Sequence, residues 1–371
     1  MDQAVLIFSG YNQRANIAFC RTADKNNIPF FIVANGEQDT IFHTQYREKV
    51  KAIRPTALLE LYLIRNIIEK LRIELNIKRF VILPNSEYLN RFFLRYRREL
   101  TKMNCIVPLV SRELYASISD KYSFGQLCEE FGLTVPEQVV EKNLPLVAKP
   151  YKYFSNLGRI LKPYIILNEK DFDIWLKTES LSDFFFQRYI AGQSYYLLYY
   201  FFRNGKRDPI AFSQQNLIQQ NNGKSIVAAI SSQLHSKNIG KKYAEFLSSL
   251  GFFGLIMIEV KYFEGLYYMI EANPRLWGPS QLFVDSKVPL FEGFLCDNGF
   301  DVKLSEKYQS TCSRYFWSGG FIETMRKKKK LIFHDYLNKT FEKEFALFFD
   351  ADIYKRHDSI NLYNNELSRP N

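Results

Sequence analysis

Four polar residues in the last third of the chain have the types needed to hold a metal ion and to stabilise developing charge. Glu259 and Glu271 each stand inside an apolar run typical of a buried strand, and Asn273 and Arg275 follow the second run. The sequence Glu-Gly-Leu at residues 264–266 separates the two runs and predicts an antiparallel hairpin. A three-residue loop, with its glycine at positive φ, places the two acids directly opposite each other, whereas a two-residue loop sends them to opposite faces.

In the first register, two carboxylates and the amide oxygen of Asn273 converge on one face of the hairpin. Like charges this close repel each other unless a cation lies between them. Oxygen ligands of this kind suit Mg²⁺, or Mn²⁺ in its place. The hairpin therefore predicts a metal site formed by Glu259, Glu271 and Asn273. The alternative is a pair of strand acids that face water and pair with Lys261 and Arg275.

Length and composition limit the class of protein. At 371 residues the chain exceeds the roughly 250–300 residues that one core usually supports, so at least two domains are expected. Hydrophobic residues at 47% suffice for sizeable cores, yet no stretch approaches the roughly 20 apolar residues of a membrane span. The start of the chain has an acid at position 2 and no small-residue cleavage site, so we expect a first strand there and not a signal peptide. The five cysteines are odd in number and scattered, which argues against a disulfide framework and favours a cytoplasmic location.

The net charge of +11 raises the question of nucleic-acid binding. Its densest segments are residues 91–100 and 325–330. In the first of these, arginines recur at helical spacing among Phe and Leu, which is typical of a solvated helix face. We therefore expect no nucleic-acid partner and interpret the surplus as surface charge or as attraction for an anionic substrate; binding through residues 91–100 remains the alternative.

The order of apolar and polar segments predicts an α/β fold. A strand at residues 4–10, a helix at 11–27 and a strand at 28–36 form a β-α-β start, which predicts a parallel sheet with right-handed crossovers. The loop after the first strand is not G-x-G-x-x-G, so the dinucleotide fingerprint is absent. Residues 111–132 have helical spacing that ends at Gly132.

Five short segments between residues 115 and 285 complete the pattern. In chain order they read SDKYSFGQLCEEFGLTVPE, LVAKPY, FSNLGR, FFQRYIAG and the acid-bearing hairpin that ends in IEANPR. Together they resemble the motifs of the ATP-grasp family, and more narrowly its carboxylate–amine ligases, whose ATP domains are like those of carbamoyl-phosphate synthetase and biotin carboxylase. The resemblance is fainter over the N-terminal domain.

The resemblance implies an α/β fold with an α+β ATP-binding part, in which a Rossmann-like parallel sheet precedes a two-lobed ATP-grasp domain. The implied segments are an N-terminal domain (1–110), a small lobe with a phosphate-loop lid (111–186), a larger lobe with the metal and substrate site (187–300) and a C-terminal extension packed on the ATP-grasp domain (301–371).

The resemblance also implies roles for single residues, with ATP and Mg²⁺ as cofactors. Arg275 and Lys149 are the implied catalytic residues. The implied nucleotide contacts are Lys121, Lys149, Ser155, Asn156, Gly158, Gln187, Arg188, Tyr189 and Ile190. Many relatives carry acids where this chain has Gln187 and Gln193-Ser194; Gln187 can still accept a hydrogen bond from the adenine amino group, whereas the ribose contact is left open.

The implied reaction is an ATP-dependent ligation of a carboxylate to an amine through an acyl phosphate. The carboxylate is expected between the N-terminal domain and the ATP domain, and the candidate substrate contacts are Asn12, Arg14, Gln215, Lys224 and Trp277. Amino acids, peptides and acidic sugars are the substrate classes considered, and a homodimer is compatible with the sequence. The alternatives are another acyl-phosphate enzyme of carboxylase type and a catalytically inactive nucleotide-binding module.

Overall fold

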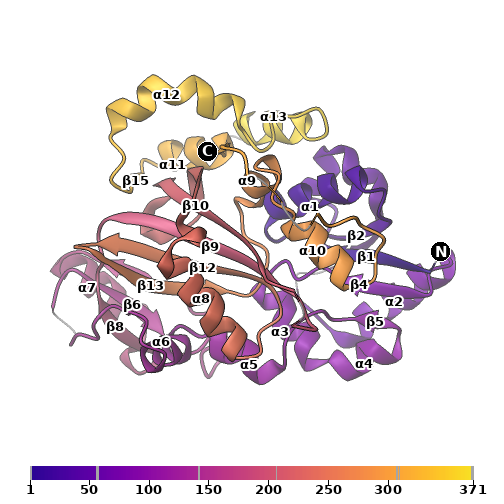
Figure 1. Cartoon of the computed structure of the whole chain (residues 1–371), viewed down its shortest axis with the longest axis horizontal. Helices are drawn as coiled ribbons and strands as arrows, with labels where there is room; N and C mark the ends of the chain where they lie inside the picture. Colours follow the sequence, from indigo (N-terminus) through magenta and orange to yellow (C-terminus); the bar gives the residue numbers. More distant parts are fainter. Residues whose placement is uncertain are drawn as a thin grey trace.

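A computed structural model describes residues 2–55, 58–140, 143–205, 207–305, 308 and 310–368. Three sheets organise these residues: a parallel sheet near the N-terminus, a small antiparallel sheet and a large antiparallel sheet. Figure 1 shows the N-terminal sheet in indigo and purple beside the large sheet in pink and orange, with the C-terminal helices in yellow along the top. The predicted α/β fold is confirmed by this architecture.

The first sheet consists of five parallel strands in the order β3-β2-β1-β4-β5. These are β1 (Gln3–Phe8), β2 (Phe30–Asn35), β3 (Val50–Arg54), β4 (Arg79–Ile82) and β5 (Cys105–Ile106), connected by α1 (Gln13–Lys25), α2 (Leu61–Glu74), α3 (Glu87–Arg95) and α4 (Arg97–Lys102). The predicted β-α-β start is confirmed, since β1 pairs with β2 in parallel across α1. Strand order reverses between β1 and β4, and in sheets of this kind ligands bind at the carboxyl ends of the strands that flank such a point.

The small lobe is an antiparallel sheet in the order β7-β6-β8. Its strands are β6 (Leu146–Pro150), β7 (Tyr164–Ile166) and β8 (Phe184–Arg188), and α7 (Glu169–Leu176) covers one face. Leu146, Ile166, Phe172, Trp175 and Phe184 form a core of their own. These side chains give the lobe a hydrophobic core separate from that of the large sheet.

The large sheet runs in the order β13-β12-β9-β10-β11-β14, and β15 pairs with β10. Its strands are β9 (Gln193–Phe201), β10 (Ile210–Gln219), β11 (Ile226–Ser232), β12 (Gly254–Phe263), β13 (Leu266–Asn273), β14 (Arg314–Phe316) and β15 (Ile332–Phe333). One face packs against α8 (Asn238–Ser249) and the other against α9 (Ser280–Asp285) and α10 (Leu290–Asp297). The remaining short helical turns are η1 (Thr40–His43), η2 (Gln45–Lys49), η3 (Leu181–Asp183), η4 (Asn221–Gly223) and η5 (Leu234–Ser236).

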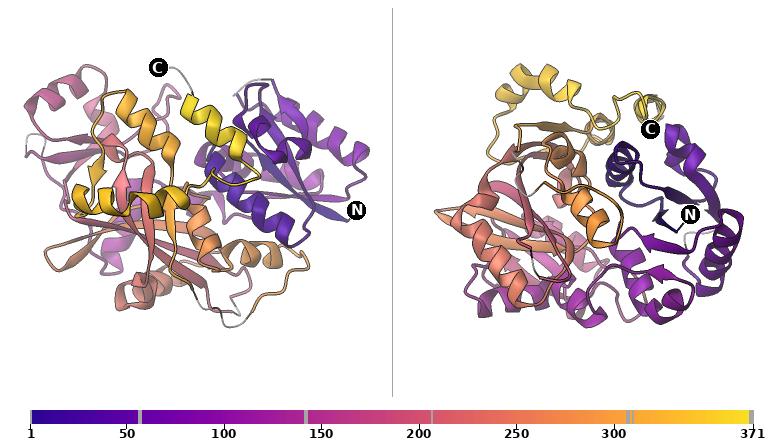
Figure 2. Two further views of the ribbon diagram at one scale, coloured as in Figure 1. Left: turned by 90° about the horizontal axis from the view of Figure 1, so that it is seen from above. Right: turned by 45° about the vertical axis from the view of Figure 1, so that its right-hand side comes forward.

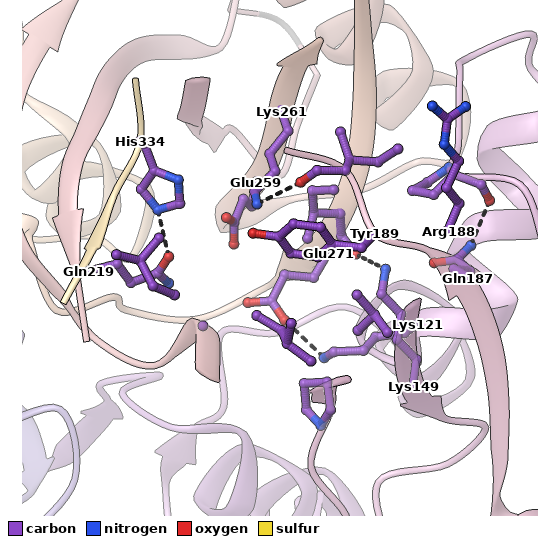
Figure 3. Close-up of a pocket in the computed structure, with 18 residues that line it drawn as sticks. Lys121, Lys149, Gln187, Arg188, Tyr189, Gln219, Glu259, Lys261, Glu271 and His334 are labelled. Carbon is purple, nitrogen blue, oxygen red and sulfur yellow. Dashed lines mark hydrogen bonds and ion pairs between the residues drawn. The ribbon is translucent and has the colours of Figure 1, made fainter. Parts of the chain in front are cut away.

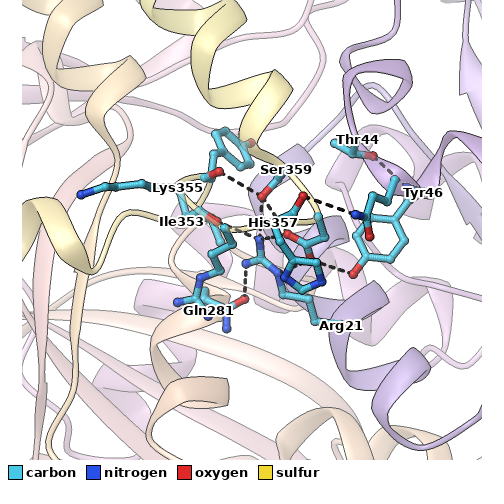
Figure 4. Close-up of polar contacts among 12 residues, drawn as sticks. Arg21, Thr44, Tyr46, Gln281, Ile353, Lys355, His357 and Ser359 are labelled. Atoms are coloured by element: carbon cyan, nitrogen blue, oxygen red, sulfur yellow. Dashed lines mark hydrogen bonds and ion pairs between the residues drawn. The ribbon is translucent and has the colours of Figure 1, made fainter.

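The C-terminal segment joins distant parts of the molecule. It contains α11 (Ser318–Arg326), α12 (Asn338–Asp350) and α13 (Ile360–Ser368), and Figure 2 shows the yellow helices reaching from the large sheet to the indigo N-terminal domain. The Asp358 carboxylate accepts hydrogen bonds from the Arg21 guanidinium at 2.8 Å and from the Tyr46 hydroxyl at 2.9 Å. Arg21 also donates to Gln281 and to the Ile353 carbonyl, so one guanidinium ties three chain segments together (Figure 4).

One predicted helical stretch is interrupted. The segment 111–132 forms α5 (Arg112–Ser119) and α6 (Lys121–Glu130), because Asp120 between them is extended, with ψ of 119°.

Two arginines of the basic segment 91–100 bind groups within the protein. Arg91 binds the Asp120 carboxylate at 2.5 Å and also the Glu87 carboxylate at 2.9 Å. Arg97 donates to the carbonyls of residues 109 and 110. Two arginines of the basic segment 91–100 therefore make internal contacts, which favours the surface-charge interpretation over nucleic-acid binding.

Among the described residues, no helix is both long and apolar enough to cross a membrane.

Candidate active site

The two acids lie opposite each other, as predicted, but for a different reason. Strands β12 and β13 pair Glu259 with Glu271. Phe263 pairs with Leu266, so the turn has two residues, Glu264 and Gly265, both at positive φ (49° and 84°). The expected three-residue loop is therefore wrong.

A β-bulge restores the facing register. Val260 pairs with Met269 and Glu259 pairs with Glu271, which leaves Ile270 as the extra residue on β13. The extra residue shifts Glu271 by one position and so returns it to the face of Glu259. The bulge also leaves the Ile270 carbonyl available to a side chain, and the Lys149 ammonium donates to it at 2.7 Å.

The two carboxylates have different partners. Glu271 accepts a hydrogen bond from the Asn273 amide at 2.7 Å and pairs with the Lys121 ammonium at 3.0 Å. Glu259 is only 6% exposed and accepts one hydrogen bond, from the Ser194 hydroxyl at 3.1 Å. Because Glu259 is buried and Glu271 pairs with Lys121, the alternative of two water-facing acids matched to Lys261 and Arg275 does not describe this geometry.

Burial and charge separate the titration of the two acids. Burial raises the pKa of the Glu259 carboxyl above its ordinary value, and the charge of Glu271 adds to the rise. Burial alone would also raise the pKa of Glu271, but the charge and hydrogen bond of Lys121 outweigh it and hold that pKa below its ordinary value. A divalent cation between the two carboxylates would relieve their repulsion, so the donor set fits a hard ion such as Mg²⁺.

Asn273 is engaged differently from the expected ligand. Its amide oxygen accepts from the Arg275 guanidinium at 2.9 Å, and its amide nitrogen faces Glu271. Asn273 therefore links the Glu271 carboxylate to the Arg275 guanidinium. The described residues contain no group of three His, Cys, Asp or Glu side chains arranged for a metal, which leaves the two carboxylates as the protein's charged donors here.

Two buried lysines beside the acids lack acidic partners. Lys149 is 5% exposed, and the Lys261 ammonium, 8% exposed, donates to the Ile190 carbonyl at 2.9 Å. Within the described residues neither ammonium makes an ion pair. Burial, helped by the charge of Lys121, lowers the pKa of Lys149 to about 7. Figure 3 shows these lysines and both acids pointing into one cavity, which suits an anion with several oxygens.

The cavity lies between the small lobe and the large sheet. Gln187, Arg188, Tyr189 and Ile190, the expected adenine contacts, line it at the end of β8. The Gln187 amide nitrogen donates to the Pro136 carbonyl at 3.1 Å, while its buried oxygen has no partner among the described residues. A buried acceptor left unsatisfied costs roughly 1–3 kcal/mol, so a ligand with an amino group would relieve it.

The predicted phosphate loop is a small hairpin. Phe154 pairs with Ile160, and the backbone N–H groups of Ser155 and Gly158 bond within the turn. Asn156 lies at its exposed tip. Arg159 of this loop binds Glu179, which follows α7. This ion pair joins the loop to the small lobe.

A second cavity adjoins the first, since Lys121, Pro163, Gly223 and Glu271 line both. Asn273, Arg275 and residues of the phosphate loop also line it. The N-terminal domain contributes Tyr11–Asn12 after β1 and Ser86–Tyr88 after β4, at the strand-order reversal of its sheet.

Of the five candidate substrate contacts, only Asn12 lines this second cavity, where its amide donates to the backbone carbonyls of Asn85 and Leu276. The other four lie outside both cavities. Arg14 donates to the Ile226 carbonyl and stacks on Trp317, and Gln215 pairs with Tyr195 on the face of the large sheet opposite Glu259.

Lys224 is exposed to solvent, and Trp277 is a 2% exposed core residue packed on Phe283. The residue type alone, polar or aromatic, could not distinguish these residues from residues that line a cavity. Which face of the sheet a side chain occupies, and whether it is buried there, depends on how the strands pair.

Several site residues were missed. A buried chain of hydrogen bonds runs from Gln214 through Asn216 to Ser194 and on to Glu259. The run of polar residues at positions 214–216, inside a strand, was the available signal. His334 and Ile332 also line the first cavity, and they come from the C-terminal segment, where no motif marked them.

Comparisons with known proteins support the fold. No protein-family model matches the chain, and no curated protein matches it. Among solved structures, N5-carboxyaminoimidazole ribonucleotide synthetase in complex with ADP is similar at a TM-score of 0.63 and 13% identity, covering 94% of this chain and 97% of that one.

Two further structures are similar over most of the chain. The biotin carboxylase domain of Hydrogenobacter thermophilus 2-oxoglutarate carboxylase, in complex with MgADP, ADP and bicarbonate, has a TM-score of 0.61 and 14% identity, with coverage of 84% and 73%. The L-amino acid ligase from Bacillus licheniformis has a TM-score of 0.56 and 14% identity, with coverage of 83% and 76%. These likenesses show that the chain has the ATP-grasp fold.

Proposed function

We propose that this chain is an ATP-dependent ligase that joins a carboxylate to an amine through an acyl phosphate and releases ADP and phosphate. The observation that supports this most directly is the pair of facing acids, Glu259 and Glu271, on the floor of a cavity with two unpaired buried lysines. The unsatisfied Gln187 oxygen at the cavity's far end gives a place for an adenine amino group. The similar structures bind ADP or MgADP, or are named as ligases.

The proposed chemistry consists of two transfers. A carboxylate oxygen attacks the γ-phosphorus of ATP, the bond from that phosphorus to the ADP oxygen breaks, and ADP leaves. An amine then attacks the acyl carbon, phosphate leaves, and the nitrogen loses a proton. Positioning and charge neutralisation provide most of the catalysis in phosphoryl transfer.

Each residue has a role that follows from its position. Glu259 and Glu271 would hold Mg²⁺, with Asn273 beside them, and a bound Mg²⁺ supplies charge neutralisation for phosphate oxygens. Lys121 and Lys149 would bind phosphate oxygens. Arg275 would stabilise the transferring phosphoryl group and the acyl oxyanion, because it borders both Asn273 and the second cavity.

The loop at residues 154–160 would close over the phosphates and keep water from the acyl phosphate. Of the three backbone N–H groups expected to donate there, those of Ser155 and Gly158 already bond within the turn, so that of Asn156 is the proposed donor.

We expect Glu271→Gln and Arg275→Ala to reduce ADP release at least a hundredfold, because each removes charge that acts in the transition state. The measurement is ADP release over pairs of carboxylates and amines, with mass spectrometry of the product. Glu130→Gln, an exposed acid on α6, is the matched control and should retain wild-type rates. Full activity of either site variant would remove that residue from the mechanism.

The likeness to a biotin carboxylase domain favours one alternative, in which bicarbonate is the carboxylate that is activated. ADP release that requires bicarbonate and no other carboxylate would support that alternative. A nucleotide-binding module without activity would bind Mg-ATP and release no ADP with any pair.

A further inference from the structure

The second cavity is lined by large apolar side chains from two parts of the chain. From the N-terminal domain, Tyr11 and Tyr88 pack at a ring-centroid distance of 5.9 Å. From the phosphate loop, Phe154 and Ile160 are 37% and 38% exposed. Large apolar side chains left exposed around a concave site mark a surface that is covered when a ligand binds.

The inner end of the cavity has a negative pole. Glu87 lies in the first turn of α3 and lines the cavity. Both nitrogens that Arg91 offers to Glu87 bind the same carboxylate oxygen, and Arg91 also pairs with Asp120. One guanidinium therefore serves two carboxylates, so Arg91, Glu87 and Asp120 together carry a net negative charge. Among the described residues Arg91 binds only one of the two Glu87 oxygens, which makes the second the candidate acceptor for a cationic ligand group.

The same cavity has a positive pole at Arg275. Its guanidinium donates to the Leu276 carbonyl and to the Asn273 amide, and in the described part of the chain it pairs with no carboxylate. Glu87 and Arg275 line the same cavity, together with Lys121. A ligand that matches both poles carries a cation and an anion a few bonds apart.

From these features we infer that the carboxylate substrate is a free α-amino acid with an aromatic or large aliphatic side chain; this rests on the proposed ligase function. The ammonium group of the amino acid binds Glu87. Its carboxylate lies toward Arg275 and the proposed metal ligands Glu259 and Glu271. Its side chain packs among Tyr11, Tyr88 and Ile160. Small or acidic amino acids leave the apolar walls uncovered, and acidic sugars offer no cation to Glu87.

The test uses the full-length chain with Mg-ATP and hydroxylamine, a small amine that converts an acyl phosphate to a hydroxamate. The readouts are ADP release and hydroxamate formation. Phenylalanine, tyrosine and leucine should give kcat/KM values at least tenfold above those of glycine, alanine and glutamate. The analogue 3-phenylpropanoate, which lacks the ammonium group, should show a KM at least tenfold higher than that of phenylalanine, because it loses a charge-assisted contact.

Variants assign the two contacts separately. Glu87→Gln should raise the KM for phenylalanine about tenfold and leave that for 3-phenylpropanoate unchanged, whereas Ile160→Ala should raise both. Ile174→Ala, which removes an apolar side chain that is 54% exposed on α7, is the matched control and should change neither. Glu87 also pairs with Arg91, so a change at Glu87 could disturb the fold. Comparing phenylalanine with 3-phenylpropanoate on the wild-type chain tests the same contact without a variant.

The outcomes separate the inference from the proposed function. Preference for glutamate, glycine or an acidic sugar, with ADP release intact, would overturn the substrate class and leave the ligase standing. Equal KM values for phenylalanine and its des-amino analogue would overturn the role of Glu87. Failure to bind Mg-ATP at all would instead overturn the proposed ligase.

Discussion

Lys149 shows at the scale of one residue how burial prepares a site for an anion. Its ammonium lies against the Ile270 carbonyl, without an acidic partner among the described residues, and burial lowers its pKa to about 7. A phosphate oxygen beside it would favour the charged form and raise that pKa. The strand motif LVAKPY in the sequence indicated this lysine. Its protonation depends on its burial in the cavity, which the sequence does not show.

We expect nucleotide binding at about pH 8 to be accompanied by proton uptake at Lys149 and to weaken as the pH rises above 7, since the free chain then holds Lys149 neutral. Calorimetry in buffers of different ionisation enthalpy measures the uptake. Lys149→Arg, which stays protonated, should abolish this contribution while keeping a cation in place. Equal proton uptake by the variant and the wild type would contradict the assignment.

Gln187 is the second residue whose role the structure sharpens, because its buried side-chain oxygen has no partner. We expect Gln187→Leu to weaken ATP binding about tenfold, by loss of one hydrogen bond to the adenine amino group. Inosine triphosphate has no such amino group and serves as the internal comparison. The wild type should prefer ATP to inosine triphosphate, and the variant should bind the two nearly alike. An unchanged preference would exclude Gln187 as the adenine reader.

At the scale of elements, the hairpin shows that one result can have two structural routes. Both a three-residue loop and a two-residue turn followed by a bulge place Glu259 opposite Glu271. Gly265 is compatible with either, and no residue near Ile270 marks the bulge. The facing pair was therefore predictable from spacing and the requirement for a shared face, whereas its cause was not.

The phosphate loop offers an element-scale prediction. Arg159 binds Glu179 and so anchors the hairpin at residues 154–160 to the small lobe. We expect Arg159→Ala to make the loop more accessible, so that limited proteolysis within it becomes faster, and Mg-ATP to reverse the effect. Lys152→Ala, an exposed lysine without an ion pair among the described residues, is the control. Equal cleavage of the Arg159 variant and the wild type would show that the ion pair does not restrain the loop.

At the scale of the whole molecule, the C-terminal segment connects the large sheet to the N-terminal domain. It adds β14 and β15 to the sheet, lines the first cavity with Ile332 and His334, and binds Arg21 through Asp358. The two halves that form the second cavity are thereby held at a defined separation.

The Arg21–Asp358 contact gives a pH-dependent contribution to stability. Burial alone would raise the pKa of Asp358, but the hydrogen bonds and charge of Arg21 outweigh it and lower that pKa to about 2. Because the folded-state value lies below the ordinary one, the contribution is complete above about pH 4 and is lost as the pH falls toward 2. It amounts to about 2 kcal/mol.

We expect Asp358→Asn to lower the free energy of unfolding by about 2 kcal/mol at neutral pH and to lose that difference near pH 2. Chemical denaturation at several pH values measures it. Asp350→Asn, whose carboxylate forms a more exposed ion pair with Lys355, is the control and should change stability little. A constant difference from pH 7 to pH 2 would contradict the assignment.

The sequence alone determined the parallel N-terminal sheet, the order of the ATP-grasp motifs, and the residues Lys121, Lys149, Gln187, Glu259 and Glu271 that the structure brings to one cavity. The sheet and the facing acids were readable because periodicity, turn residues and a costly buried charge are local signals, whereas Lys121, Lys149 and Gln187 followed from the family resemblance. Only the tertiary structure decided that Arg14, Gln215 and Trp277 lie outside the cavities, and that Ser194, Glu87 and His334 belong to the site. Which side chains share a cavity depends on sheet face, strand order and the packing of distant segments, and no local pattern encodes those long-range contacts.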